Sequence, residues 1–168
     1  MSLILATEMS EVERVEKFRD LVKRCKRALG EEDVVTLEAL NYLGGQLQEN
    51  GEYEEAIEVY ERCLAGRMKV LGEDHKGTLG MLTNLGVVYY GLKNYENTLE
   101  YYERALKGSE RLMWMAHPDT LVTVMNIAII YAMKRDHKEA AVYFRKALEV
   151  NVAQLGKDNE STKKAQEM

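Results

Sequence analysis

The sequence predicts an all-α fold, a right-handed α-solenoid of antiparallel helix pairs. First, the chain of 168 residues matches itself at an offset of 42 residues without any insertion. Second, apolar residues within each unit recur at spacings of three and four, which is the period of an amphipathic helix. Third, the only proline is Pro118, so long helices are not interrupted. One helix pair cannot bury its apolar face alone, whereas stacked pairs can, and a repeat of pairs therefore predicts a solenoid.

Columns of matching residues define the repeat. One column holds threonine in every unit, a second holds leucine or isoleucine, a third holds glycine or alanine, and a fourth holds an aromatic residue. These columns are Thr36, Thr78, Thr120 and Thr162; Leu43, Leu85 and Ile127; Gly44, Gly86 and Ala128; and Tyr60, Tyr102 and Phe144. The small residues of the third column predict that the two helices of a pair approach closely there.

Each complete unit contains two amphipathic helices, which we call A and B in chain order. A lone B-type helix comes first, three complete A–B pairs follow, and a truncated A helix comes last. In order, these segments cover residues 8–29, 33–71, 75–113, 117–155 and 159–168. The sequence therefore predicts a single array over 8–168 that resembles a segment cut from a longer one.

Polar residues mark where each A helix begins. Aspartate, asparagine and histidine side chains can accept hydrogen bonds from the free N–H groups of the first turn. The expected N-caps are Asp33, His75, His117 and Asn159. Pro118 takes the first helical position, where its missing N–H has no consequence. Because the two histidines share a capping column, we interpret them as caps and not as metal ligands or acid–base groups.

The B helices carry signals at both ends. Glu52, Asn94 and Asp136 stand directly before them and are expected to be N-caps. Leucine–glycine pairs end three of these helices, and the glycine is expected in the left-handed C-cap conformation. The pairs are Leu29-Gly30, Leu71-Gly72 and Leu155-Gly156.

The second unit departs from this pattern. Trp114 stands in the glycine column, and tryptophan cannot easily take a left-handed conformation. Residues 113–116 are therefore expected to form a different, apolar linker. We favour packing of Trp114 over the junction that follows, with contact to a partner as the alternative.

Composition excludes several classes of function. The net charge of −5 does not suit nucleic acid binding, which needs a basic surface. The longest apolar run, residues 127–133, is too short to cross a membrane, so no membrane association is expected. Cys25 and Cys63 are too few for a disulfide framework, and we interpret them as reduced thiols of a cytoplasmic protein.

The sequence also lacks the usual signatures of catalysis. It contains no phosphate-binding loop, no paired CxxC motif and no serine–histidine–aspartate arrangement with supporting context. The glutamates between residues 52 and 61 have the spacing of a solvated helix face. Enzyme activity, a cofactor and a metal site are therefore not expected.

From about Phe18 onward, the columns resemble those of the tetratricopeptide repeat. Matching motifs in the second unit are Asn84-Leu85-Gly86 and Ala105-Leu106. The period of 42 rather than 34 residues, with motifs such as Leu71-Gly72-Glu73-Asp74-His75, resembles the long-period subclass found in kinesin light chains and in signalling arrays. This resemblance implies a protein-interaction module that binds a peptide or a partner helix in a concave groove.

The resemblance also implies which residues line the groove. The family often places an asparagine on the groove face of helix A, where Asn84 and Asn126 stand, with Tyr42 in the first unit. Neighbours on that face are Asn41, Val87, Tyr90, Met125, Ile129 and Met133. None of these residues is basic, unlike the grooves that clamp a chaperone's terminal carboxylate or an acidic kinesin cargo motif. We therefore expect a ligand with an apolar anchor near the third unit, where methionine can adapt to its shape.

Two alternative functions stay open at this level. One is a self-associating or sensor repeat array of a larger signalling protein, and the other is the cargo-adaptor domain of a kinesin light chain-like protein. Apolar residues at the two ends of the array would also favour weak end-to-end homo-oligomers.

Overall fold

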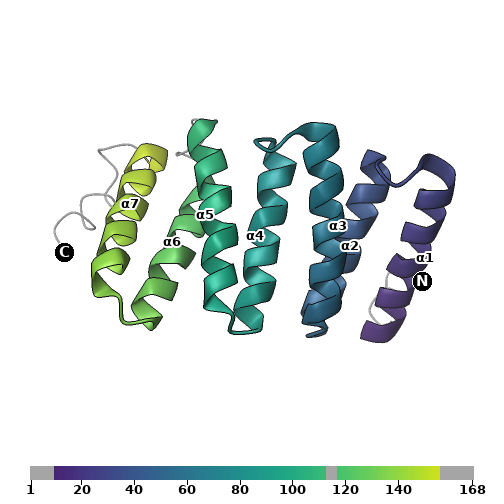
Figure 1. Ribbon diagram of the computed structural model, residues 1–168, viewed down its shortest axis with the longest axis horizontal. Coiled ribbons are helices and arrows are strands. Elements are labelled where there is room, and N and C mark those ends of the chain that lie inside the picture. Colours follow the sequence, from purple (N-terminus) through teal and green to yellow (C-terminus); the bar gives the residue numbers. More distant parts are fainter. Residues whose placement is uncertain (1–9, 113–116, 156–168) are drawn as a thin grey trace, which may run out of the picture.

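Seven α-helices and no strands make up the part of the chain that the computed structural model describes, residues 10–112 and 117–155. In chain order the helices are α1 (Glu11–Leu29), α2 (Val34–Glu49), α3 (Tyr53–Leu71), α4 (Lys76–Gly91), α5 (Tyr95–Arg111), α6 (Pro118–Met133) and α7 (His137–Leu155). Figure 1 shows them following one another along the long axis, with α1 at one end and α7 at the other. The predicted all-α solenoid of helix pairs is confirmed, with A helices α2, α4 and α6 and B helices α1, α3, α5 and α7.

The predicted caps of α2, α4 and α6 are confirmed, whereas Glu52, the predicted N-cap of α3, makes no side-chain capping bond. Asp33 Oδ1 accepts a hydrogen bond from the Val35 N–H at 2.8 Å. His75 Nδ1 accepts from the Gly77 N–H at 3.1 Å, and His117 Nδ1 accepts from the Asp119 N–H at 3.2 Å. A histidine ring nitrogen therefore accepts in this column where Asp33 uses a carboxylate oxygen.

The threonine column joins α2 and α4 to the B helices before them. Thr36 Oγ1 donates to the Gly30 carbonyl at 2.7 Å, and Thr78 Oγ1 donates to the Gly72 carbonyl at 2.8 Å. Both threonines are buried. Each bond satisfies a carbonyl at the end of a B helix, where the helix itself provides no donor.

Helix termination differs from the prediction. Gly30 and Gly72 have positive φ angles of 96° and 89°, but their ψ angles of 169° and 166° are extended and not left-handed helical. The left-handed residues instead end the A helices: Gly51 (φ 79°), Lys93 (φ 58°) and Arg135 (φ 61°). The reason is geometric. A B helix leads into an extended link to the next repeat, whereas the chain between A and B must reverse within a few residues.

The first helix also begins later than residue 8. Ser10 and Glu13 form a capping box, in which the Glu13 N–H donates to Ser10 Oγ at 3.3 Å and the Ser10 N–H donates to Glu13 Oε2 at 2.9 Å. This box places the first helical residue at Glu11. The linker with Trp114 and the truncated helix at 159–168 lie outside the described residues.

Close approach within each pair follows from the glycine column, as predicted. A Cβ atom at Gly44 would lie 2.5 Å from the Tyr60 ring, and one at Gly86 would lie 2.5 Å from the Tyr102 ring. Both tyrosines are buried. In the third pair Ala128 replaces the glycine, and Phe144, which stands in the tyrosine column, is 42% exposed.

The buried core falls into two clusters that meet at α5. The larger contains residues of α1, α2, α3 and α4 with Ala105 of α5. The smaller joins α5 to α6 and α7 through residues such as Tyr102 and Ile127. The two clusters therefore divide within the second repeat, and a surface cavity opens nearby between α4 and α6.

Candidate functional site

The predicted groove residues lie on the A helices, and every one of them is at least partly exposed. Tyr42, Tyr90, Met125, Ile129 and Met133 are exposed. Asn41, Asn84, Val87 and Asn126 are half-buried. A row of polar and apolar side chains thus runs across α2, α4 and α6.

Four of these residues meet in one cavity between α4 and α6. The cavity has a volume of about 220 Å³, which is room for one or two side chains and less than a drug-sized pocket. It is lined by Val87, Tyr90, Tyr102, Asn126, Ile129 and Ile130. Tyr102 and Ile130 were not predicted from the sequence, and Tyr102 stands in the aromatic column that packs against the A helix.

The rim of this cavity is aromatic and apolar. The Tyr90 hydroxyl lies 3.9 Å from Met133 Sδ, and the Tyr90 ring centroid lies 6.0 Å from that of Tyr95. Tyr90, Ile129 and Met133 are 42%, 42% and 48% exposed. Exposed apolar side chains around a small cavity are typical of a surface that receives a partner's side chain.

The two groove asparagines have different roles. Asn84 Nδ2 donates to Asn41 Oδ1 at 3.2 Å, which joins α4 to α2 and closes the seam between the first and second repeats. Asn126 Nδ2 donates to the Tyr102 hydroxyl at 3.5 Å, at the long limit of a hydrogen bond. Burial raises the pKa of Tyr102 to about 12, so its hydroxyl stays protonated. Asn126 makes the longer of the two bonds, so its amide is held less firmly by the protein than that of Asn84.

The first-repeat end of the groove is polar and acidic. The Tyr60 hydroxyl donates to Gln48 Oε1 at 3.5 Å, and Gln46 Nε2 donates to Glu49 Oε2 at 2.9 Å. Burial raises the pKa of Tyr60 to about 12. The exposed carboxylate of Glu49 gives this end its negative charge.

Arg67 is a cation that the sequence reasoning missed. Its side chain rises from α3 and is only 8% exposed. Nη1 donates to the Gly77 carbonyl at 2.9 Å, and Nη2 donates to Glu38 Oε1 at 2.6 Å. Gly77 makes the room, because a Cβ there would lie 2.7 Å from Arg67 Nη1. The guanidinium joins α2, α3 and α4, and its charge is already balanced by Glu38.

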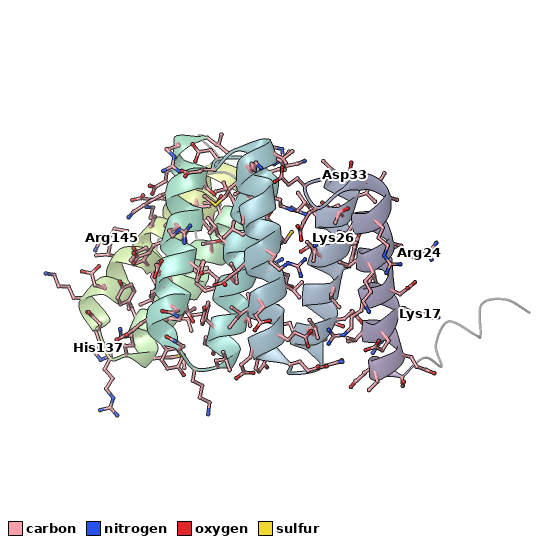
Figure 2. All side chains as sticks on the ribbon, turned by 45° about the vertical axis from the view of Figure 1, so that its right-hand side comes forward. Lys17, Arg24, Lys26, Asp33, His137 and Arg145 are labelled. Carbon is pink, nitrogen blue, oxygen red and sulfur yellow. The ribbon has the colours of Figure 1, made fainter. Side chains whose placement is uncertain are left out.

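The basic residues of α1 and α7 lie at the two ends of the array. Figure 2 shows Lys17, Arg24 and Lys26 along α1, and His137 and Arg145 on α7. Arg24 lies 3.8 Å from Asp20, and Lys26 lies 2.6 Å from Glu31. These acidic neighbours offset the positive charges of Arg24 and Lys26.

Both cysteines are free thiols. Burial raises the pKa of Cys63, which donates to the Leu37 carbonyl at 3.1 Å and is held as an unreactive thiol. In the part of the chain that the structure describes, no three histidine, cysteine or acidic residues gather as metal ligands. No described helix has the length and apolar content to span a bilayer.

Comparison with known families decides the identity of the repeat. A family model of the tetratricopeptide repeat matches residues 35–111 and 77–151. The chain belongs to the tetratricopeptide repeat family. The resemblance inferred from the columns is confirmed, and in general this repeat fold is a non-catalytic scaffold for protein interactions.

Solved tetratricopeptide structures show the same fold. BtubC (BKLC) from P. vanneervenii superposes with a TM-score of 0.74 at 20% identity, over 94% of this chain and 63% of that one. A kinesin light chain-type protein of Podosopora anserina with nearly identical TPR-like repeats gives 0.78 at 22% identity, over 93% and 74%. The apo form of RapI gives 0.67 at 22% identity, over 97% and 64%.

These neighbours confirm the long-period, kinesin light chain-like subclass at the level of the fold. The chain spans less than two thirds of the length of BtubC and of RapI. No curated protein sequence matches the chain significantly.

Proposed function

We propose that this array is a non-catalytic interaction module whose groove face binds a segment of a partner protein. The cavity between α4 and α6 carries the proposal, because it combines an apolar rim with the less firmly held amide of Asn126. An anchor side chain that fills such a cavity contributes about 1.5–3 kcal/mol through burial of apolar surface. The Asn126 amide would fix the segment by hydrogen bonds to its backbone.

The charges around the cavity do not suit two other kinds of ligand that tetratricopeptide grooves bind. A clamp for a terminal carboxylate and a groove for acidic cargo both need accessible cations. The predicted groove residues carry none, and Arg67 is buried against Glu38. A cargo-adaptor role in the cytoplasm would be a special case of the proposal, with an apolar anchor in the cargo segment.

The experiment compares peptide capture by the purified chain and by two variants. Asn126→Asp with Ile129→Asp places charges at the cavity and should reduce capture from a displayed random-peptide library to background. The matched control is Val142→Asp, which charges an apolar residue that is 46% exposed on α7. Helical content by circular dichroism must be unchanged in both variants. Equal capture by the wild type and the cavity variant would refute the proposal.

Self-association is the second candidate, and exposed apolar residues of α1 favour it. Val12 is 70% exposed and Leu21 is 38% exposed. If these residues mediate contact between copies, sedimentation velocity should show a larger species as concentration rises, and Val12→Glu with Leu21→Glu should remove it. A monomer at all concentrations would eliminate this candidate.

A further inference from the structure

We infer that the partner segment has two parts: an apolar anchor for the α4/α6 cavity and, about four or five residues from it, a lysine or arginine that pairs with Glu49. The inference rests on the proposed function and adds the chemistry of the ligand. The observation behind it is a difference in polarity along the groove. The α2 end is acidic and rich in hydrogen-bond acceptors, whereas the α6 end is apolar.

The acceptor end is built by four residues of the first repeat: Gln46, Gln48, Glu49 and Tyr60. Glu49 is exposed at the end of α2, and one of its oxygens, Oε2, accepts from Gln46 Nε2 at 2.9 Å. Gln48 Oε1 lies 3.5 Å from the Tyr60 hydroxyl, so a second acceptor stands beside the carboxylate. No lysine or arginine within 10–112 and 117–155 forms an ion pair with Glu49. A cation supplied by a ligand would therefore find an unneutralised carboxylate.

The other carboxylate of α2, Glu38, shows by contrast why Glu49 is the relevant one. Glu38 Oε1 is held by Arg67 Nη2 at 2.6 Å. That internal ion pair neutralises the negative charge of Glu38. A ligand cation therefore gains more electrostatic attraction at Glu49, which lies at the opposite end of α2.

The spacing of the two parts follows from the register of the repeat. Glu49, Gly91 and Met133 occupy one column, at the ends of α2, α4 and α6. The bond from Asn84 to Asn41 shows that α2 and α4 are neighbours. Packed helices lie about 8–10 Å apart, so the cavity between α4 and α6 lies roughly 15 Å from Glu49. An extended peptide covers this distance in about four or five residues at about 3.3–3.6 Å each.

The test is selection from a displayed library of random linear peptides about a dozen residues long, enough to cross all three A helices. Wild-type protein should enrich peptides that combine a large apolar residue with a lysine or arginine about four or five positions away. Glu49→Lys should change that preference from basic to acidic and retain the apolar residue. Glu54→Lys, the same charge reversal at an exposed position of α3, is the matched control and should select the same peptides as the wild type.

A charge-swap cycle on one selected peptide makes the result quantitative. Replacing the peptide's basic residue by glutamate should weaken binding to the wild type by about fivefold, as expected for an exposed pair, measured by fluorescence anisotropy. The same peptide should regain affinity for Glu49→Lys. Binding that depends on Ile129 but shows no charge preference, or an acidic one, overturns the two-part ligand and leaves the proposed function standing. Failure to enrich any peptide overturns both.

Discussion

At the scale of single residues, the packing depends on glycines, because the lack of a side chain lets a neighbouring side chain approach the helix backbone. Gly44 and Gly86 leave room for the Tyr60 and Tyr102 rings, and Gly77 leaves room for the Arg67 guanidinium. The first two contacts could be predicted because glycine and tyrosine columns recur together. Arg67 could not, because Ser109 stands in its column and no repeat pattern marks the position.

The glycine contacts predict opposite effects for the same substitution at two positions of α4. Gly86→Ala should lower the free energy of unfolding by about 1–3 kcal/mol, because the new Cβ would overlap the Tyr102 ring. Gly80→Ala should raise it by up to about 1 kcal/mol, because nothing lies within 4 Å and alanine is the better helix former. Urea denaturation followed by circular dichroism measures both. Equal effects at the two positions would contradict this account of the helix contact.

At the scale of helices, beginnings were easier to predict than ends. An N-cap is a local arrangement of a polar side chain and the next turn, so Asp33 and His75 could be recognised from their column alone. The B helices end at Leu29 and Leu71 as predicted, but the glycine after each is extended and not left-handed helical, because the conformation of a terminating residue depends on where the chain must go next. The pair Asn41–Asn84 was missed as a contact for the same reason, since it depends on the distance between two repeats.

The corrected helix ends make a prediction about the left-handed positions. Lys93 and Arg135 have φ angles of 58° and 61°, at the position where the first repeat has Gly51. Lys93→Gly and Arg135→Gly should each raise the free energy of unfolding by about 1 kcal/mol, because a left-handed conformation is strained for residues with a Cβ. Lys134→Gly is the control, since its φ of −73° gives glycine no advantage. Loss of stability in Lys93→Gly would show that the turn is not strained.

At the scale of the whole molecule, ion pairs join helices and links along the array. Arg19 of α1 pairs with Glu55 of α3, Lys69 of α3 pairs with Glu32 before α2, and Arg111 of α5 pairs with Asp74 before α4. The last two pairs are equivalent to each other, because Lys69 and Glu32 stand one period of 42 residues before Arg111 and Asp74. Their partners could not be predicted from charge alone, because many exposed acids compete for each cation.

These pairs predict how stability changes with pH. Hydrogen bonds from Arg19 and Arg111 hold the pKa values of Glu55 and Asp74 below their ordinary values of 4.5 and 3.8. Because the folded pKa values are depressed, this stabilisation is complete above about pH 4.5 and is lost as the pH falls through the folded values. Thermal unfolding between pH 7 and pH 3 should show the decline. Arg19→Gln with Arg111→Gln should show a smaller decline, and an identical one would contradict the assignment.

The central claim is that a partner segment binds across the A helices and anchors between α4 and α6. Photo-crosslinking tests it most directly. Benzoylphenylalanine replaces either Tyr90, at the rim of the cavity, or Val142, exposed on α7, and each protein is irradiated with a peptide selected by the wild type. If the segment anchors between α4 and α6, a crosslinked product forms from position 90 and none from position 142. Crosslinking from position 142 alone would show that the ligand lies outside the groove and would contradict the account.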